Sequence, residues 1–322
     1  MISAFLLSLQ PIPADCTEER AAVAEMAEAI DRKYVLADVA TRSAAAVRKK
    51  LHEGTFYQHC TDSEAFAKHM TKQLRAILND GHVFVEYAPN SSQAGEDDWL
   101  EEWRDGAPAR GFGVKQVERL KGNISYLHLT DFYEFSTAEK AITAAFELVS
   151  SSDGLILDLR NNPGGSPETE WPVQWTFMAP GSTMPLHRET RHGKKPDTKE
   201  PALQWPRYGA ERPLAIIVDK STFSAPEAVA YSLQAQGRAI VFGSPSGGGA
   251  HMLGDAVPLT GGWHIVIPET RPYSPHTGGN WEGTGVTPDI ETTKEDAVDT
   301  TQKWIARKLE SKRAASKTET AP

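Results

Sequence analysis

The stretch Gly154-Leu-Ile-Leu-Asp-Leu-Arg-Asn-Asn-Pro-Gly-Gly165 joins an apolar segment directly to a glycine turn. Its first half is apolar enough for a strand that is buried on both faces, as in a parallel sheet. Its second half ends in two glycines, which allow positive φ and a close approach of the backbone to a ligand. The stretch therefore predicts a buried strand that ends in a turn. That turn is either structural or part of an oxyanion-binding site.

Strands and helices alternate on both sides of this stretch. Further strands are predicted at Asn123–Leu129, Pro213–Val218 and Ala239–Phe242, and helices at Thr137–Ser150 and Ala225–Gln236. Alternating strands and helices are typical of an α/β core with a parallel sheet. The segment between Pro180 and Arg212 is rich in proline and charge, and we interpret it as a hairpin or flap on the surface.

The first part of the chain has a different pattern. Residues 17–79 contain three runs with helical periodicity, and His82–Tyr87 then alternates as a short strand. We predict a helical N-terminal domain over residues 1–88, a polar connector over 89–110, an α/β core over 111–310 and a disordered tail over 311–322.

Composition excludes several classes of partner. The chain has 322 residues and a formal net charge of -9, which argues against binding to nucleic acid or to an anionic membrane. No apolar stretch reaches the ~18 residues of a membrane span. Cys16 and Cys60 are too few for a disulfide framework, but they leave one disulfide open if the protein is exported. The apolar run Ile2–Leu9 lacks the basic residues of a signal peptide, so export and a cytoplasmic location both stay open.

The segment Ser221-Thr-Phe-Ser-Ala-Pro-Glu227 can be interpreted in two ways. Ser224 and Glu227 have the spacing of a helix capping box, with Pro226 in the first turn. A serine at a strand-to-helix turn also lies at the positive end of a helix, where a nucleophile can face a developing oxyanion. From these residues alone, both roles remain open.

Two more glycine-rich segments follow, Ser244–His251 and Thr277–Ile290. Neither contains a phosphate-binding pattern, and no His or Cys cluster has metal-ligand spacing. We therefore expect no metal and no cofactor.

The ordered set of these motifs carries a resemblance. L-N-D-G-H, Y-L-H-L, L-D-L-R-N-N-P-G-G, S-T-F-S-A-P-E, G-S-P-S-G-G-G-A and N-W-E-G-T-G-V-T-P-D-I occur in this order between residues 78 and 290. The set resembles the serine peptidase family of the C-terminal processing proteases, the tricorn protease core and the modules of interphotoreceptor retinoid-binding protein. The resemblance implies a crotonase-like β/α core behind a small helical domain.

The resemblance also implies roles for individual residues. Ser224 matches the nucleophile, Ala225 supplies one oxyanion donor, and Gly164 or Gly165 supplies the other. The processing proteases use a lysine where this chain has Gly249, and glycine cannot accept a proton.

The tricorn and retinoid-module branch instead takes a histidine as base, which maps to His82, and orients it with a glutamate, which maps to Glu282. A serine hydroxyl needs such a base, and the imidazole needs an acidic partner. Lys220 and His251 are weaker candidates for the base. The branch has a serine where this chain has Gly81, and the region after His82 is too short for the PDZ domain that many processing proteases carry.

The implied partner is a peptide or protein substrate, and self-association into a homo-oligomer is a further expectation. Two alternatives remain. In one, the fold binds an apolar ligand without proteolysis, and Trp171, Trp175, Phe177 and Trp205 line the cavity. In the other, the same triad hydrolyses small esters.

Overall fold

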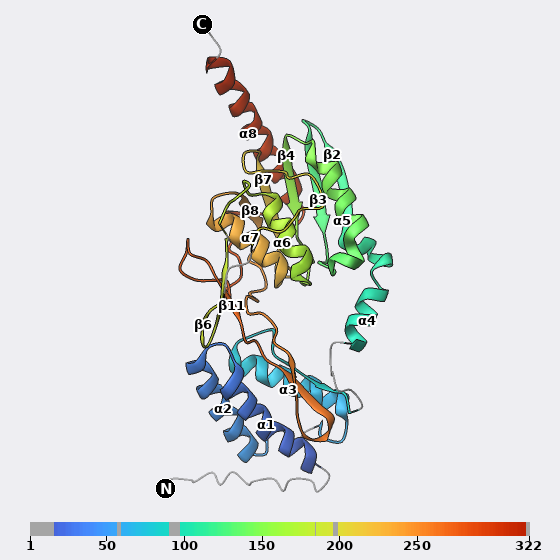
Figure 1. The fold of residues 1–322 in the computed structure, drawn as a ribbon, viewed down its shortest axis with the longest axis vertical. Coiled ribbons are helices and arrows are strands. Elements are labelled where there is room, and N and C mark those ends of the chain that lie inside the picture. The colour runs from blue at the N-terminus through green and yellow to red at the C-terminus, as the bar shows by residue number, and fades with distance from the viewer. Residues whose placement is uncertain (1–15, 57–58, 90–96, 184, 196–198, 320–322) are drawn as a thin grey trace, which may run out of the picture. The chain divides into compact units, whose positions relative to one another are not determined.

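The computed structural model describes residues 16–56, 59–89, 97–183, 185–195 and 199–319, which form two compact units (Figure 1). The helical unit comprises Met1–Glu101, Glu189–Lys194 and His251–Arg271, and the sheet unit comprises Glu102–Arg188, Lys195–Ala250 and Pro272–Pro322. Two late segments therefore join the N-terminal unit, whereas the sequence divided the chain into continuous domains. The apolar run Ile2–Leu9 lies outside the described residues.

The helical unit contains the three predicted helices, α1 (Thr17–Lys33), α2 (Ala37–His52) and α3 (Ser63–Leu78). Asp62 caps α3, because its carboxylate accepts a hydrogen bond from the N–H of Ala65 at 3.0 Å. An antiparallel sheet in the order β1-β10-β9 completes the unit, with β1 (Phe84–Tyr87), β9 (Ala256–Pro258) and β10 (Trp263–Val266). A short 3-10 helix (Thr260–Gly262) joins β9 to β10. Pairing of β10 with β1 explains why residues 251–271 belong here.

A disulfide links Cys16 to Cys60 in this unit, with their Cα atoms 5.6 Å apart. Both residues are buried in the apolar cluster that also contains Phe66 of α3 and Trp263 of β10. The sequence had left this disulfide open.

The sheet unit is built on six strands in the order β12-β8-β7-β4-β3-β2. The strands are β2 (Val114–Leu120), β3 (Ile124–Leu129), β4 (Gly154–Asp158), β7 (Leu214–Val218), β8 (Ile240–Gly243) and β12 (Ile290–Glu291). All neighbours are parallel except β2 and β3. The predicted α/β fold with a parallel sheet is confirmed, and β2 and β12 are strands that the sequence did not predict.

Both faces of this sheet are buried, as the apolar run in Gly154–Gly165 predicted. Leu155 and Leu157 of β4 pack into one apolar cluster, whereas Ile156 between them packs into another. This alternation follows from the two-residue period of a strand. The first cluster includes residues of α5 (Phe135–Ser150), α6 (Pro167–Thr176) and α7 (Ala225–Ala235), and the second includes residues of α8 (Ala297–Glu319) (Figure 1).

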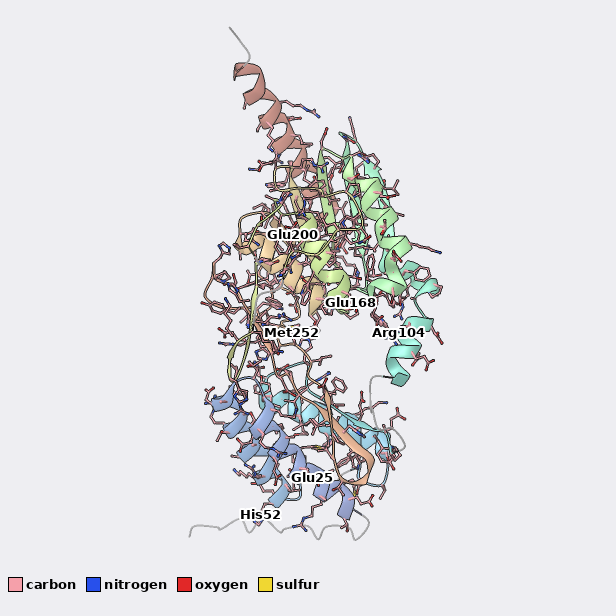
Figure 2. The ribbon with its side chains drawn as sticks, viewed as in Figure 1. Glu25, His52, Arg104, Glu168, Glu200 and Met252 are labelled. Carbon is pink, nitrogen blue, oxygen red and sulfur yellow. A yellow bond between two sulfur atoms is a disulfide. The ribbon has the colours of Figure 1, made fainter. Side chains whose placement is uncertain are left out.

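Three segments differ from the prediction or refine it. Helix α8 continues to Glu319, so the disordered tail predicted from residue 311 is wrong over 311–319, where residues such as alanine and lysine favour a helix. Part of the predicted connector is helical, as α4 (Asp97–Asp105) and a 3-10 helix (Pro108–Gly113). Arg104 of α4, labelled in Figure 2, pairs with Glu134 at 2.7 Å.

The expected surface hairpin is present as β5 (His187–Thr190) and β6 (Gly193–Lys194), which pair antiparallel next to β11 (Arg271–Tyr273). Within the described residues, none of the helices combines the length and the apolar character that a membrane crossing requires.

Candidate active site

Ser224 stands between β7 and α7 in a strained backbone conformation. It is the residue before the first turn of α7, and its φ of 67° and ψ of −118° lie outside the regions that non-glycine residues favour. Such strain persists only where the surroundings enforce it, and it concentrates at functional sites. A sharp strand-to-helix turn of this kind presents a serine hydroxyl at the end of a sheet.

The surroundings that enforce this conformation centre on Glu227. Ser224 and Glu227 form the predicted capping box, and the N–H of Ser224 donates to Glu227 Oε2 at 2.8 Å. The same carboxylate accepts from the N–H groups of Gly248 and Gly249 at 2.7 and 2.9 Å and from the hydroxyl of Ser246 at 2.5 Å. Burial raises the pKa of Glu227, and these four donors oppose that rise. One buried carboxylate thus fixes the serine turn and the second glycine-rich segment together.

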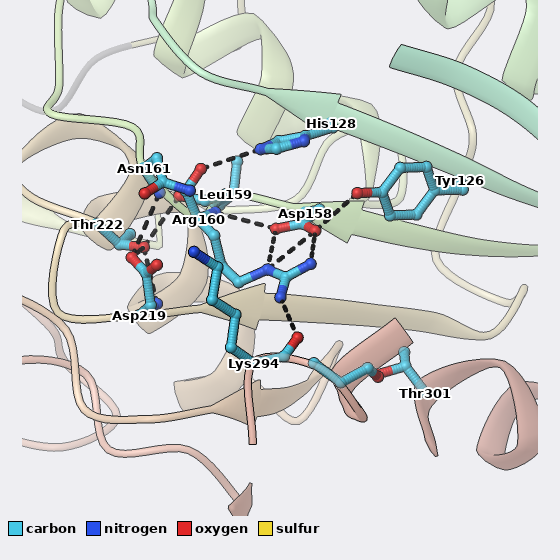
Figure 3. Close-up of polar contacts among 11 residues, drawn as sticks. Tyr126, His128, Asp158, Leu159, Arg160, Asn161, Asp219, Thr222, Lys294 and Thr301 are labelled. Atoms are coloured by element: carbon cyan, nitrogen blue, oxygen red, sulfur yellow. Dashed lines mark hydrogen bonds and ion pairs between the residues drawn. The ribbon is translucent and has the colours of Figure 1, made fainter. Parts of the chain in front are cut away.

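The loop that leads into Ser224 is fastened to the end of β4 (Figure 3). Thr222 donates its hydroxyl to the carbonyl of Leu159 at 2.9 Å, and the N–H of Asn161 donates to Asp219 at 3.3 Å. The N–H of Phe223 also donates to the carbonyl of Asn162 at 3.0 Å. These bonds fix the position of the serine turn relative to the first glycine turn.

Asp158 and Arg160 support the same junction through a second set of contacts (Figure 3). Arg160 pairs with the buried Asp158 at 2.6 Å, and Tyr126 donates its hydroxyl to that carboxylate at 2.8 Å. Arg160 also donates to the carbonyl of Lys294 at 2.8 Å. The two charges therefore have a structural role at the end of β4.

The two candidate oxyanion glycines differ in what they contact. Gly164 faces the serine, because a Cβ built on it would lie 3.1 Å from Cβ and 3.6 Å from Oγ of Ser224. Its N–H, however, donates to the side chain of Asn162 at 3.0 Å. Gly165 forms a parallel bridge with Phe132 whose two bonds use the carbonyl of Gly164 and the N–H of Ser166. The N–H of Gly165 takes part in neither bond, and Gly165 is exposed.

Gly249, which the resemblance places at the lysine position of the processing proteases, is held on both sides. Its N–H donates to Glu227, and its carbonyl accepts a 2.8 Å bond from the indole of Trp281. The third glycine-rich segment, which contains Trp281, therefore packs onto the second. Glu282 follows Trp281, is half-buried, and accepts from the N–H of Ala250 at 2.6 Å.

His82 lies in the helical unit and is buried. Burial lowers its pKa to about 4, although the nearby carboxylate of Asp80 acts in the opposite direction. The backbone N–H of His82 donates to Asp80 Oδ1 at 2.8 Å, and the ring atom Nδ1 of His82 lies 3.8 Å from the same oxygen. At neutral pH the imidazole is therefore uncharged and able to accept a proton.

Asp80 is the centre of a buried polar cluster. His251 Nδ1 lies 2.7 Å from Asp80 Oδ2, and Tyr34 donates its hydroxyl to that oxygen at 3.0 Å. Burial on its own would raise the pKa of Asp80, but the hydrogen bond and charge of His251 and the N–H of His82 hold it below its ordinary value.

The predicted site residues therefore lie in both units. Ser224, Ala225, Gly164 and Gly165 are brought together in the sheet unit, which also contains Glu282. His82 belongs to the helical unit, so its pairing with Ser224 and with Glu282 stays a prediction. Sequence reasoning missed two carboxylates. Glu227 was interpreted only as a cap, and Asp80, two residues before the candidate base, was given no role in the site.

Comparison with known proteins places the chain in a family. The profile of Peptidase family S41 matches residues 123–292. A carboxy-terminal-processing protease of Bartonella bacilliformis is 31% identical over 182 residues, which cover 55% of this chain and 41% of that protein. The chain thus spans less than half the length of this curated relative.

Solved structures show a similar fold. The photosystem II D1 C-terminal processing protease matches with a TM-score of 0.53 at 18% identity, over 86% of this chain and 94% of that chain. The tricorn protease matches with a TM-score of 0.59 at 13% identity, over 90% of this chain and 37% of that chain. The family profile covers more than half of the sequence and includes the serine turn and all three glycine-rich segments. The chain therefore belongs to peptidase family S41, a family of serine peptidases.

Proposed function

We propose that this chain hydrolyses peptide bonds and that Ser224 is the nucleophile. The observation that carries the proposal is the strained backbone of Ser224 at the start of α7, held by Glu227 and faced by Gly164. A helix start offers unpaired N–H groups and a positive electrostatic potential, both of which stabilise negative charge.

In the proposed reaction, Ser224 Oγ forms a bond to the peptide carbonyl while its proton passes to His82. The carbonyl oxygen gains the negative charge. The protonated imidazole then gives its proton to the leaving amine as the C–N bond breaks, and water releases the acyl group by the same steps.

We assign the oxyanion donors to the N–H groups of Ala225 and Gly165. Ala225 occupies the first position of α7, where the N–H has no acceptor within the helix. Gly165 is favoured over Gly164 because the N–H of Gly164 is already bonded to Asn162, whereas Gly165 is exposed. A donor of this kind typically contributes about a hundred- to a thousandfold in rate.

We infer that His82 is the base, with a carboxylate to orient it. Its buried, neutral imidazole supports this role. Glu282 is the orienting residue that the resemblance implies, and Asp80 is a second candidate because it lies next to His82 within the same unit. We also propose a crotonase-like arrangement for the sheet unit, which its parallel strands with helices on both faces support.

The alternative of an apolar-ligand module has less support. Trp175 and Phe177, which the sequence placed in a candidate cavity, are 1% and 0% exposed and belong to the core. They fill space between the helices and the sheet. The remaining two residues of that set, Trp171 and Trp205, line a pocket in the sheet unit.

We further propose an oxidising compartment for this protein. Disulfides such as Cys16–Cys60 persist mainly in exported proteins, because the cytosol keeps thiols reduced.

The peptidase proposal is tested by incubating the purified chain with unfolded casein and following new N-termini. We expect cleavage by the wild type and by Ser221→Ala, since Ser221 is an exposed serine of the same loop. We expect no cleavage by Ser224→Ala. Equal cleavage by Ser224→Ala and the wild type would contradict the proposal.

A further inference from the structure

A pocket of about 430 Å³ lies in the sheet unit beside the segment that follows the oxyanion glycines. Its walls are mainly aromatic rings and prolines, among them Phe135, Pro167, Trp171, Pro172, Pro201 and Trp205. They come from three separate places in the sequence: the start of α5, the first half of α6 and the segment after residue 200. The volume is within the range of pockets that hold small ligands.

The walls of this pocket are fixed in position. The indole of Trp205 donates to the hydroxyl of Thr176 at 2.6 Å and stacks on Phe146 with the ring centroids 4.8 Å apart. The guanidinium of Arg188 lies over the ring of Trp171, 5.1 Å from its centroid. Rings held in this way lose little conformational freedom when a ligand binds.

The pocket is close along the chain to Gly164, the glycine that faces Ser224. Gly164, whose α-carbon faces Ser224, is three residues from Pro167 in the pocket wall, so their Cα atoms are at most about 11 Å apart. The bridge between Phe132 and Gly165 holds two segments side by side at the glycine turn. One segment continues to Phe135 and the other to Pro167, and both of these residues line the pocket. A peptide bound at Ser224 can therefore reach the pocket with a side chain near the scissile bond.

The side chains that line the pocket determine which kind of substrate side chain it can bind. Most of the lining side chains are apolar. The carboxylate at the rim, Glu168, lies on α6 (Figure 2) and accepts a hydrogen bond from the N–H of Phe135 at 3.3 Å. A carboxylate at the rim disfavours an acidic residue, and rigid rings favour a flat or long apolar side chain.

We propose that this pocket is the specificity pocket of the peptidase, and that it holds one aromatic or long aliphatic side chain of the substrate within two residues of the scissile bond. This inference rests on the proposed function, because it takes Ser224 as the point of attack. It goes further in naming the side chain that the substrate must carry and the residues that select it.

The first test maps cleavage sites in a denatured protein digest by mass spectrometry. We expect phenylalanine, tyrosine, tryptophan, leucine and methionine to be enriched at one position within two residues of the cut. Trp171→Ala and Ala202→Glu should reduce that enrichment. Ala202 is exposed at the pocket wall, so its variant is expected to fold even if Trp171→Ala does not. The control Leu148→Ala removes an apolar side chain that is 61% exposed on α5 and should change nothing.

A second test needs no catalysis. In the Ser224→Ala protein, calorimetry compares a blocked alanine-based nonapeptide carrying one central phenylalanine with the same peptide carrying alanine there. We expect the phenylalanine peptide to bind roughly 10- to 100-fold more tightly, and Ala202→Glu to abolish the difference.

The two proposals fail in different ways. Fluorophosphonate labelling of Ser224 tests the nucleophile and should not depend on the pocket variants. Cleavage without apolar enrichment, or enrichment that survives both pocket variants, would overturn the pocket assignment while leaving the nucleophile in place. Absence of labelling would overturn the nucleophile, and equal affinity for the two peptides would then overturn the pocket as well.

Discussion

The carboxylate of Glu227 accepts a hydrogen bond from the backbone N–H of Ser224 at 2.8 Å, and Glu227 itself is completely buried. The same side chain binds the N–H groups of Gly248 and Gly249. An interaction that looks like a local helix cap in the sequence thus connects segments about twenty residues apart. It also holds the backbone of Ser224 in its strained conformation.

Glu227→Ala should therefore both destabilise the protein and slow its chemistry. Removing the carboxylate leaves several buried donors without an acceptor, and each such group costs about 1 to 3 kcal/mol. We expect the free energy of unfolding to fall by at least about 2 kcal/mol in urea titrations. The labelling rate of Ser224, measured on the folded fraction, should fall as well. The exposed Glu139→Ala on α5 is the control, and a Glu227→Ala protein that labels as fast as the control would contradict this role.

Gly164 and Gly165 should respond differently to alanine. At Gly165 a Cβ would lie 2.0 Å from the carbonyl oxygen of Phe132, so we expect Gly165→Ala to lose at least about 2 kcal/mol of stability. At Gly164 the Cβ would instead crowd Ser224, so we expect the labelling rate to fall more than stability does. Gly193→Ala is the control, since its φ of 122° is similar but nothing lies within 4 Å of the added Cβ. Chemical unfolding and labelling kinetics distinguish the three variants.

Glu170 should make stability depend on pH. Its pKa is raised from 4.5 to about 8 by burial, against the opposing hydrogen bond from Gln174. A carboxyl group with a raised folded-state pKa stabilises the protein below its unfolded-state pKa, and that contribution is lost as the pH rises toward the folded-state value. The free energy of unfolding should therefore fall by up to about 1.4 kcal/mol for each pH unit between pH 4.5 and pH 8.

Glu170→Gln is expected to remove this dependence, because glutamine keeps the shape and cannot ionise. Thermal unfolding scans from pH 5 to pH 9 provide the comparison. Parallel curves for the wild type and Glu170→Gln would show that Glu170 does not ionise over this range.

The disulfide between Cys16 and Cys60 should stabilise the helical unit. It closes a loop with a sequence separation of 44 residues, for which the chain-entropy relation gives about 4 kcal/mol, and measured values are often lower. We expect the double variant Cys16→Ser and Cys60→Ser to lose about 2 to 4 kcal/mol. Reduction of the wild type should reproduce that loss and should leave the double variant unchanged.

Much of the fold could be predicted from local patterns. The run before Asp158 predicted a strand buried on both faces, and the alternation of Leu155, Ile156 and Leu157 between two apolar clusters confirms it. Helix α6 was missed because Pro172 interrupts the pattern, although Ser166 and Pro167 provide a proper helix start. The assignment of residues 251–271 to the helical unit depends on the pairing of β10 with β1, which no local pattern encodes.

The parts of the candidate site that lie within short sequence motifs could be predicted. The serine turn and the glycine turn were found in this way. The choice between Gly164 and Gly165 depends on the hydrogen bond from Gly164 to Asn162, and the cluster around Asp80 depends on His251, far away in the sequence. Such long-range contacts exist only in the folded chain.

The most direct test of the central claim is the rate of covalent labelling by a fluorophosphonate as a function of pH. Peptide mapping should place the label on Ser224. The rate should fall as the pH drops through about 4, because protonation of His82 removes the base. His82→Ala should label at least about 100-fold more slowly at neutral pH. Circular dichroism at each pH confirms that the protein is folded. A label on another residue, or an unchanged rate and pH profile in His82→Ala, would contradict the account.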